Sequence, residues 1–536
     1  MNIRLVEYDS SVFICDDSGG TLDTFECRLD LTETTTWMEM LNIQLMGADH
    51  NFFYSLMFEN HFLWGNIQYA VFDELKLVNR YQLLLTHLNK NWERYKLISI
   101  DVSPELAGVL SFLGMFPGQR KTWPRIIDLL RSGLLGAFNY FSLYFFKIVA
   151  RRRPRPVLLY TPDIIDSEWR CDFRFFNVYN LLGKKSIRFY EVFHSSGLLR
   201  ALKGRWLQKR VCWYLESVNA DVDALPRIPK LSLNSLLERW WAYRGEHFVR
   251  RALGEKKRIK SYMKILRQTG VKILLAMDDM RSIPSLVCAC NQAEIPVVLI
   301  QHGLLTPYHI GWVVPGISPE YLFKVDKYLV HTPYWEGVLF RHAPHLHFGA
   351  EQISGWSDNG VFRVFQREGK RRDSLRVLIV YETLWPDLKE LQEFMSALNT
   401  DERLTVVFKV RRDVNEAKQI RQYFGTEYGV TVVNTLDEQV LSTIDVIVGS
   451  HSSLLYQLLV TEIPIVKIMT SYAYGDQLIL DDLATPWHEG EDAMSVMEEA
   501  LGTHPEKLRQ RALQFMGDEV VPNYKEQLLK IIEQIT

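Results

Sequence analysis

A histidine follows an apolar run where a parallel sheet would present it to a ligand. The run "VVLI" at 297–300 predicts a buried strand and ends in Gln301, His302 and Gly303. Polar side chains at the carboxyl end of such a strand face the edge where ligands bind. A histidine there can take a proton from an acceptor hydroxyl or contact a phosphate. The alternative is a turn whose histidine has no chemical role.

Two carboxylates, Asp278 and Asp279, directly follow the run "ILLAM" at 273–277. They are rival candidates for a catalytic base, because a neighbouring strand end would face the same acceptor. They could equally cap a helix that begins near Arg281. Adjacent aspartates are not the spaced D-x-D motif of a metal site, so we expect no metal and no cofactor.

Two basic residues stand at the end of a strand that we expect later in the chain. "VFKVRRD" places Lys409 and Arg411 at the end of an apolar run. Alternation directs both side chains to one side of the strand. Such a pair can grip a diphosphate or phosphodiester, although a solvated strand end explains it too.

Small hydroxyl residues stand between another apolar run and a helix. The run 446–449 is followed by Ser450, His451, Ser452 and Ser453. Free backbone N–H groups at a helix start form an anion site. Serines there also cap helices, and the two interpretations are compatible.

Strands alternating with helices must position these residues. Apolar runs typical of strands occupy 96–102, 156–162, 186–193, 271–277, 296–300 and 327–331, and then 375–382, 404–410, 430–435, 446–450 and 464–469. Their alternation with helical patterns predicts parallel sheets with helices on both faces. The segment 231–270 is expected to form two helices, because its apolar residues repeat every 3.6 positions.

At 536 residues, the chain is too long for one core. We expect an acceptor-side α/β domain with helical insertions at 1–355 and a nucleotide-sugar-binding domain at 356–515. A final helix within 516–536 should pack back near the hinge. The boundary lies in a stretch rich in Gly, Ser, Asp and Asn, and Gly355 within it is expected to line the cleft.

Composition excludes several classes of protein. With 47% hydrophobic and 24% charged residues the chain is globular, and its formal charge of −2 gives no drive toward nucleic acid. Its 6 cysteines include no C-x-x-C pair, which indicates structural thiols in a reducing compartment. The N-terminus lacks the apolar run of a signal peptide, so we expect a cytoplasmic protein.

One segment, 120–155, could touch a membrane. Its centre, 132–150, is rich in aromatic residues and almost uncharged, and arginines flank it on both sides, including "RRRPRP" at 151–156. This pattern fits a helix lying in the headgroup region of an anionic bilayer. Burial in the N-terminal domain explains it as well, and a true membrane span is the weaker alternative because Asn139, Ser142 and Lys147 interrupt the run.

Five quoted stretches together resemble a known family. They are "MDDMRSIPSLVCACNQAEIPVVLIQHG", "DKYLVHTPYWEGVL", "ISGWSDNG", "FKVRRD" and "VGSHSSLLYQLLVTEIPIV". Over about 270–470 the chain is similar to GT-B glycosyltransferases of bacterial surface-polysaccharide assembly, such as CDP-glycerol glycerophosphotransferases and CMP-sugar transferases. The resemblance implies two doubly wound parallel-sheet domains facing across a cleft. It also implies transfer of a sugar or glycerol phosphate from a nucleotide-activated donor to a glycan or lipid-linked acceptor, at the inner face of the cell membrane.

The resemblance assigns roles to individual residues. It makes His302 a catalytic base or a donor to phosphate, and it places Lys409 and Arg411 at the family's phosphate-binding K-x-H-P position. Ser452 and Ser453 would meet the donor phosphate.

Two departures leave the donor open. Arg411 stands where the family usually has histidine, and Gln457 stands near the position of a carboxylate that holds a ribose diol. A sugar-nucleotide epimerase of similar architecture and a non-catalytic assembly subunit are the alternatives.

Overall fold

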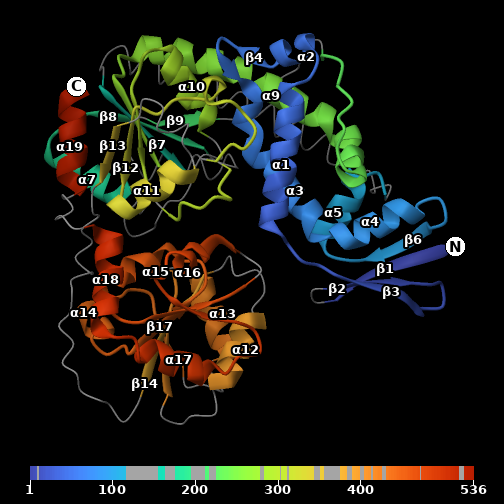
Figure 1. Cartoon of the computed structure of the whole chain (residues 1–536). Helices are drawn as coiled ribbons and strands as arrows, with labels where there is room; N and C mark the ends of the chain where they lie inside the picture. Colours follow the sequence, from blue (N-terminus) through green and yellow to red (C-terminus); the bar gives the residue numbers. More distant parts are fainter. Residues whose placement is uncertain are drawn as a thin grey trace.

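The described residues form three sheets of four or more strands and one two-stranded hairpin, and Figure 1 shows how the larger elements are arranged. The computed structural model describes residues 1–8, 11–115, 155–162, 175–194, 212–215, 225–277, 283–301, 303–310, 313–342, 351–354, 375–382, 389–398, 404–411, 414–424, 430–470, 473–517 and 524–535. Among these residues, no helix is both long and apolar enough to cross a membrane. The segment expected to touch a membrane lies almost wholly outside them.

The first large sheet is entirely parallel, in the order β13-β12-β11-β10-β7-β8-β9. Its strands are β7 (Val157–Pro162), β8 (Phe189–His194), β9 (Cys212–Leu215), β10 (Ile273–Met277), β11 (Val297–Ile300), β12 (Lys327–Val330) and β13 (Glu351–Ser354). The chain first winds from β7 toward β9 and then from β10 toward β13. The winding therefore reverses between β7 and β10, which is the doubly wound pattern.

The second large sheet repeats this pattern in the order β16-β15-β14-β17-β18-β19, also all parallel. Its strands are β14 (Leu375–Val380), β15 (Leu404–Lys409), β16 (Thr431–Val433), β17 (Val446–Gly449), β18 (Ile465–Ile468) and β19 (Thr485–Trp487). Its winding reverses between β14 and β17. The expectation of an α/β fold with two doubly wound parallel sheets is confirmed.

Alternate side chains of the first sheet enter cores on its two faces. Leu158 and Tyr160 join one core with the helices α9 (Ser235–Thr269) and α10 (Pro284–Gln292). Val157 and Leu159 join the opposite core, which is closed by α7 (Phe176–Lys184) and the C-terminal helix α19 (Tyr524–Ile535). Both faces are thus buried, as an all-parallel sheet requires.

The prediction of two helices in 231–270 is wrong, because α9 is a single helix of 35 residues. Asn234 caps its start by accepting from the Leu237 N–H at 2.9 Å, and Gly270 ends it with φ of +68°. The segment contains no proline. Its interior glycines cost about 1 kcal/mol each, which the continuous apolar face outweighs by burying Trp240, Phe248 and Ile259.

The strand expected at 96–102 forms, but in a separate mixed sheet of order β3-β2-β1-β6. The sheet contains β1 (Asn2–Tyr8), β2 (Ser11–Cys15), β3 (Thr21–Glu26) and β6 (Lys96–Asp101). The first four residues of β6 alternate between exposed and half-buried, whereas β10 and β11 are buried at every position. A strand with that alternation suits a sheet with one solvated face.

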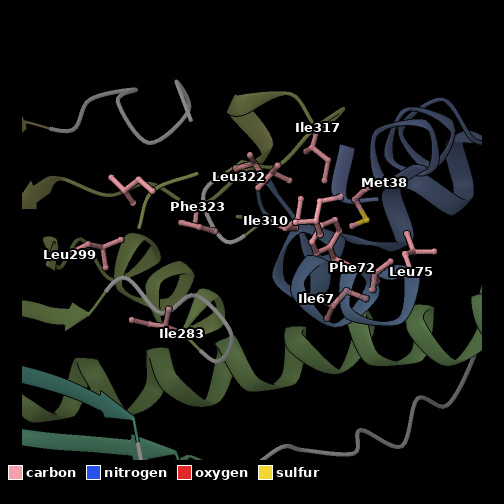
Figure 2. Packing of buried hydrophobic residues seen from close by; sticks show 14 of the residues in the cluster. Met38, Ile67, Phe72, Leu75, Ile283, Leu299, Ile310, Ile317, Leu322 and Phe323 are labelled. Carbon is pink, nitrogen blue, oxygen red and sulfur yellow. The ribbon is translucent and has the colours of Figure 1, made fainter. Parts of the chain in front are cut away.

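Helices connect this small sheet to the first large sheet. They are α1 (Leu31–Met46), α2 (His50–Ser55), α3 (Gln68–Arg80), α4 (Gln82–Asn91) and α5 (Pro104–Phe112), with the short hairpin β4 (Met57–Phe58) and β5 (His61–Phe62) and the 3-10 turn η1 (Leu63–Ile67). Figure 2 shows Met38 and Phe72 from this N-terminal module packing toward Ile310 and Ile317 of the chain after β11.

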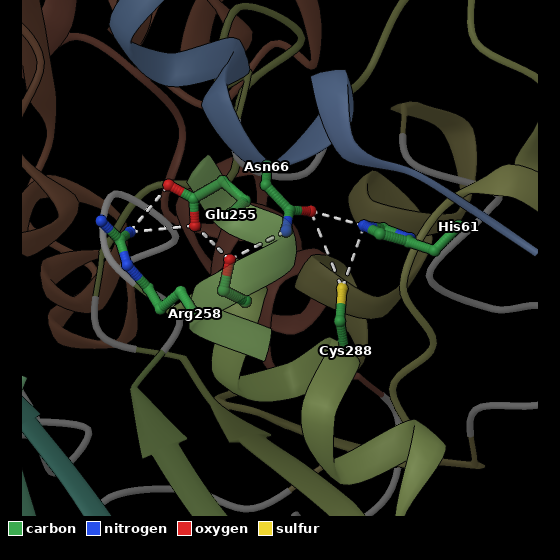
Figure 3. A network of polar contacts seen from close by, with 6 residues as sticks. His61, Asn66, Glu255, Arg258 and Cys288 are labelled. Carbon is green, nitrogen blue, oxygen red and sulfur yellow. Dashed lines mark hydrogen bonds and ion pairs between the residues drawn. The ribbon is translucent and has the colours of Figure 1, made fainter. Parts of the chain in front are cut away.

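A buried polar network also joins the N-terminal module to the first sheet (Figure 3). His61 Nε2 lies 2.5 Å from Asn66 Oδ1 and 3.0 Å from Cys288 Sγ. Asn66 donates to the Ser285 hydroxyl at 2.9 Å. Ser285 donates to Glu255, which Arg258 neutralises. Burial raises the pKa of the Cys288 thiol, so this cysteine is structural and not a nucleophile.

The two large sheets contact each other through aromatic side chains. The helix α11 (Pro333–His342) follows the carboxyl end of β12, and α15 (Ser453–Leu458) follows that of β17. The rings of Trp335 and Tyr456 lie 4.7 Å apart, and both approach Phe515 of α18 (Pro505–Met516). Tyr334 donates to Asp481 at 2.7 Å. The carboxyl edges of the two sheets therefore face each other.

Candidate functional site

The reversal of winding in the second sheet brings charged and hydroxyl groups together. β14 pairs with β15 on one side and with β17 on the other, so that Val380 lies opposite both Lys409 and Gly449. Glu382, Arg411 and Ser450 follow these three strand ends. Ligands of open α/β sheets bind at this reversal, outside the carboxyl ends of the strands.

Arg411 is already paired at this edge. Its guanidinium contacts the Glu382 carboxylate, and its backbone N–H donates to Glu416 at 2.6 Å. The Lys409 ammonium donates to the Val410 carbonyl at 2.6 Å. Both predicted cations thus reach the carboxyl edge, but a carboxylate that the sequence reasoning missed faces one of them.

The predicted hydroxyl residues form the turn between β17 and α15. Ser450, His451 and Ser452 are buried. Ser452 caps α15 by accepting from the Leu454 N–H at 3.2 Å, as its capping interpretation expects. Ser453 opens the helix and, with Gln457 one turn later, is half-buried. The helix has only 6 residues, so its dipole contributes little to anion binding.

His451 is neutral at physiological pH in this environment. Burial is the main cause that lowers the pKa of His451 to about 4; Glu382 opposes this shift, and the charges of Lys467 and Arg411 add to it. The charges of Glu382, Lys467 and Arg411 therefore all act on the His451 ring. Because the ring is neutral, it can donate or accept a hydrogen bond but adds no positive charge.

Lys467 is a second residue that sequence reasoning missed. It lies fully buried within β18 and pairs with Asp476 at 2.8 Å. Burial lowers the pKa of Lys467, while Asp476 raises it. The only signal in the sequence was a lysine inside the apolar run "PIVKIM", where a buried charge requires a partner.

Gly475, in the loop after β18, packs directly against the turn at Ser450. A Cβ added at Gly475 would lie 2.1 Å from the Ser450 carbonyl oxygen and 2.9 Å from the His451 Cα. Any other residue would displace backbone here. Gly475 ends the 3-10 turn η6 (Ala473–Gly475), and Asp476, which holds Lys467, follows directly.

On the first sheet, Gln301 holds the chain around His302. Its side chain accepts from the His331 N–H at 2.9 Å and donates to the Gly303 carbonyl at 2.9 Å. Gln301 is buried and so acts through the backbone on either side of His302. Gly303 lacks a left-handed φ, and a Cβ added there would meet no atom within 4 Å. The backbone therefore does not require glycine at this position.

Four predicted residues lie outside the described residues: His302, Asp278, Asp279 and Gly355. In the sequence, His302 stands between Gln301 and Gly303, and the aspartates directly follow β10, at the reversal of winding in the first sheet. Among the described residues, no three His, Cys, Asp or Glu side chains are grouped to hold a metal ion.

The chain after His302 reaches the second sheet. The ring of Tyr308 lies 6.3 Å from that of Tyr474, perpendicular to it, and Tyr474 directly precedes Gly475. Tyr308 also lies 3.3 Å from the Thr32 hydroxyl of α1. One edge-to-face contact thus connects the loop that carries His302 with the loop that supports Ser450 and His451.

Comparisons with known proteins return structures only. No protein-family model and no curated sequence matches the chain. MurG of Acinetobacter baumannii is 13% identical and covers 71% of this chain and 100% of its own, with a TM-score of 0.45. The calicheamicin glycosyltransferase CalG4 is 10% identical to this chain. The match covers 71% of this chain and 98% of CalG4, with a TM-score of 0.45. A UDP-N-acetylglucosamine 2-epimerase is 11% identical to this chain. The match covers 71% of this chain and 95% of the epimerase, with a TM-score of 0.37. The doubly wound fold stated above rests on the strand order and not on these distant likenesses.

Proposed function

We propose that the protein is a glycosyltransferase of the GT-B type. It would move a sugar or glycerol phosphate from a nucleotide-activated donor to a surface-polysaccharide or lipid-linked acceptor. The observation that carries the proposal is the Tyr308–Tyr474 contact, which draws the loop after His302 toward the polar reversal of the second sheet. A base on one sheet and phosphate ligands on the other are the two elements that transfer from a nucleotide requires.

In this proposal the second sheet holds the donor. Arg411 and Lys409 contact its phosphates, the turn 450–453 supplies hydroxyl and backbone N–H groups, and Gln457 faces the ribose. His302 takes the proton of the acceptor, with Asp278 or Asp279 as the alternative base. No metal or cofactor is assigned a role. Segment 120–155 would contact anionic lipid, so that vesicle binding should fall with salt and with charge reversal of 151–153.

The test is nucleotide binding, measured by thermal shift against CDP, CMP, UDP, GDP and dTDP. A ligand that binds only the native state raises the midpoint of unfolding. We expect one nucleotide to stabilise the protein and the K409A/R411A variant to lose that shift while unfolding cooperatively. Equal shifts in the double variant, or no shift with any nucleotide, would overturn the proposal.

A further inference from the structure

A row of cations lies on the outer face of α9. Residues 256–277 contain 7 lysines and arginines and no aspartate or glutamate, in a chain whose formal charge is −2. Lys257, Lys260, Lys264 and Arg267 are all exposed. Their spacing of three, four and three residues places them along one face of the helix. The Lys260 ammonium also lies 5.8 Å from the ring of Phe58.

A second group of cations follows α7. Residues 175–190 contain 3 basic and no acidic residues. These three, Lys184, Lys185 and Arg188, are exposed at the end of α7 and before β8.

The two groups meet at one edge of the first sheet. α9 leads into β10 and α7 leads into β8, and β7 pairs with both strands. The Lys272 N–H donates to the Pro156 carbonyl before β7 at 2.8 Å. Neighbouring strands lie about 4.8 Å apart, so both helix ends and Lys272 lie along one short rim. We call Lys184, Lys185, Arg188, Lys264, Arg267 and Lys272 the amino-edge surface.

Helix capping accounts for only part of this charge. Lys184 and Arg267 occupy the last turns of α7 and α9, where a cation interacts favourably with the helix dipole. Lys185, Arg188 and Lys272 stand beyond the helix ends, and Lys264 stands before the last turn. The surface also lies at the amino ends of the strands, whereas the candidate site lies beyond carboxyl ends. Stabilisation of the helix ends therefore does not explain the whole amino-edge surface, and this surface is not part of the candidate site.

We propose that the amino-edge surface binds an anionic lipid bilayer. Its cations come from helices on opposite faces of the sheet, so they form a broad rim instead of a groove that could follow a nucleic-acid strand. None of the exposed large apolar side chains of the described residues lies at 184–188 or 257–272, so stacking platforms for bases are lacking there. An anionic bilayer attracts clustered cations near its surface without requiring a groove or a stacking platform.

The experiment is cosedimentation of the full-length protein with phosphatidylglycerol-containing vesicles and with pure phosphatidylcholine vesicles, without nucleotide. We expect binding to the anionic vesicles only, weakening as salt rises. The variants K264E/R267E and K184E/K185E should each reduce the partition coefficient at least tenfold. The matched control is K418E/R421E on α13 (Val414–Phe424), which reverses the same number of exposed charges on the second sheet. It should bind as the wild type does.

Three results would overturn the inference. They are equal binding to both kinds of vesicle, equal losses in the control and in the two variants, and binding to single-stranded DNA but not to vesicles. Circular dichroism of each variant verifies the fold. Arg151 to Arg153 are unchanged in these variants, so a loss of binding relative to the wild type reports on the amino-edge surface and not on segment 120–155. No donor is present, so the result does not depend on the proposed transfer reaction.

Discussion

Glu382 and Arg411 form an ion pair across the ends of the neighbouring strands β14 and β15. The Glu382 side chain is 13% exposed and that of Arg411 is 54% exposed. The pair places a carboxylate where the proposed function requires a phosphate. An anion that binds Arg411 must therefore either displace Glu382 from the guanidinium or lie close to the negative charge of Glu382, which repels it.

Removing this carboxylate charge should strengthen nucleotide binding. Exposed ion pairs contribute about 0.2–1 kcal/mol, so E382Q is expected to tighten nucleotide binding by up to about fivefold. Titration calorimetry with the nucleotide selected by thermal shift measures the change. E416Q is the comparison, because Glu416 binds the Arg411 backbone and not its guanidinium. Weaker binding in E382Q would instead make Glu382 a ligand of the donor.

Replacing His302 tests the proposed base. H302A should lower turnover by about two orders of magnitude or more, within the range for loss of a general base. Nucleotide affinity should change little if His302 is the base and markedly if it contacts phosphate. Full activity in H302A, or its failure to fold, would make His302 a structural turn residue.

Gly475 should be intolerant of a side chain. G475A must displace the Ser450 carbonyl or its own loop, and we expect a loss of about 1–3 kcal/mol in the free energy of unfolding together with weaker nucleotide binding. The control is G303A, where a Cβ meets open space. Urea denaturation compares the two. Equal stability of G475A and wild type would contradict the close approach.

Two buried histidines should make the fold sensitive to acid. Burial lowers the pKa of both His61 and His451 from 6.5 to about 4. Between pH 6.5 and pH 4 the unfolded chain therefore binds more protons than the folded protein, and stability falls as pH falls through this window. Each histidine accounts for a loss of at most about 3 kcal/mol. Urea denaturation from pH 7.5 to pH 4.5 measures the slope.

The variant H61Q isolates one of the two contributions. It removes the titrating ring that contacts Asn66 and Cys288, so its stability at pH 7.5 should be lower but its acid dependence shallower. H488Q, at an exposed position, should keep the slope of the wild type. An unchanged slope in H61Q would mean that other groups dominate acid unfolding.

Local patterns in the sequence were enough to predict the two parallel sheets and the cations and serines at their strand ends. Lys409 and Arg411 follow an apolar run, which is a signal within a few residues. The Arg411–Glu382 pair joins residues 29 apart and depends on the register of β14 with β15, which no local pattern contains. Lys467 was hidden because five apolar residues in "PIVKIM" outweigh one charge, and its partner Asp476 lies nine residues later, directly after the turn η6.

Errors in the prediction of individual elements had a similar cause. The small mixed sheet recruits β6 by pairing it with β1, more than 90 residues earlier in the sequence. Periodicity alone does not predict that α9 is one continuous helix, because the two glycines inside it are residues that often end helices. Tertiary packing decided both cases.

The chain crosses between the two large sheets twice, and the second crossing has a consequence for modularity. Phe515 of α18 packs with Tyr456 beside the second sheet, whereas Leu528, Ile531 and Ile532 of α19 fill the core of the first. The first sheet is therefore completed by the last residues of the chain. Grafting the second sheet from another protein would succeed only if the graft ended before Tyr524 and native residues followed, since a foreign tail would expose the part of the first sheet's core that α19 covers beside α7.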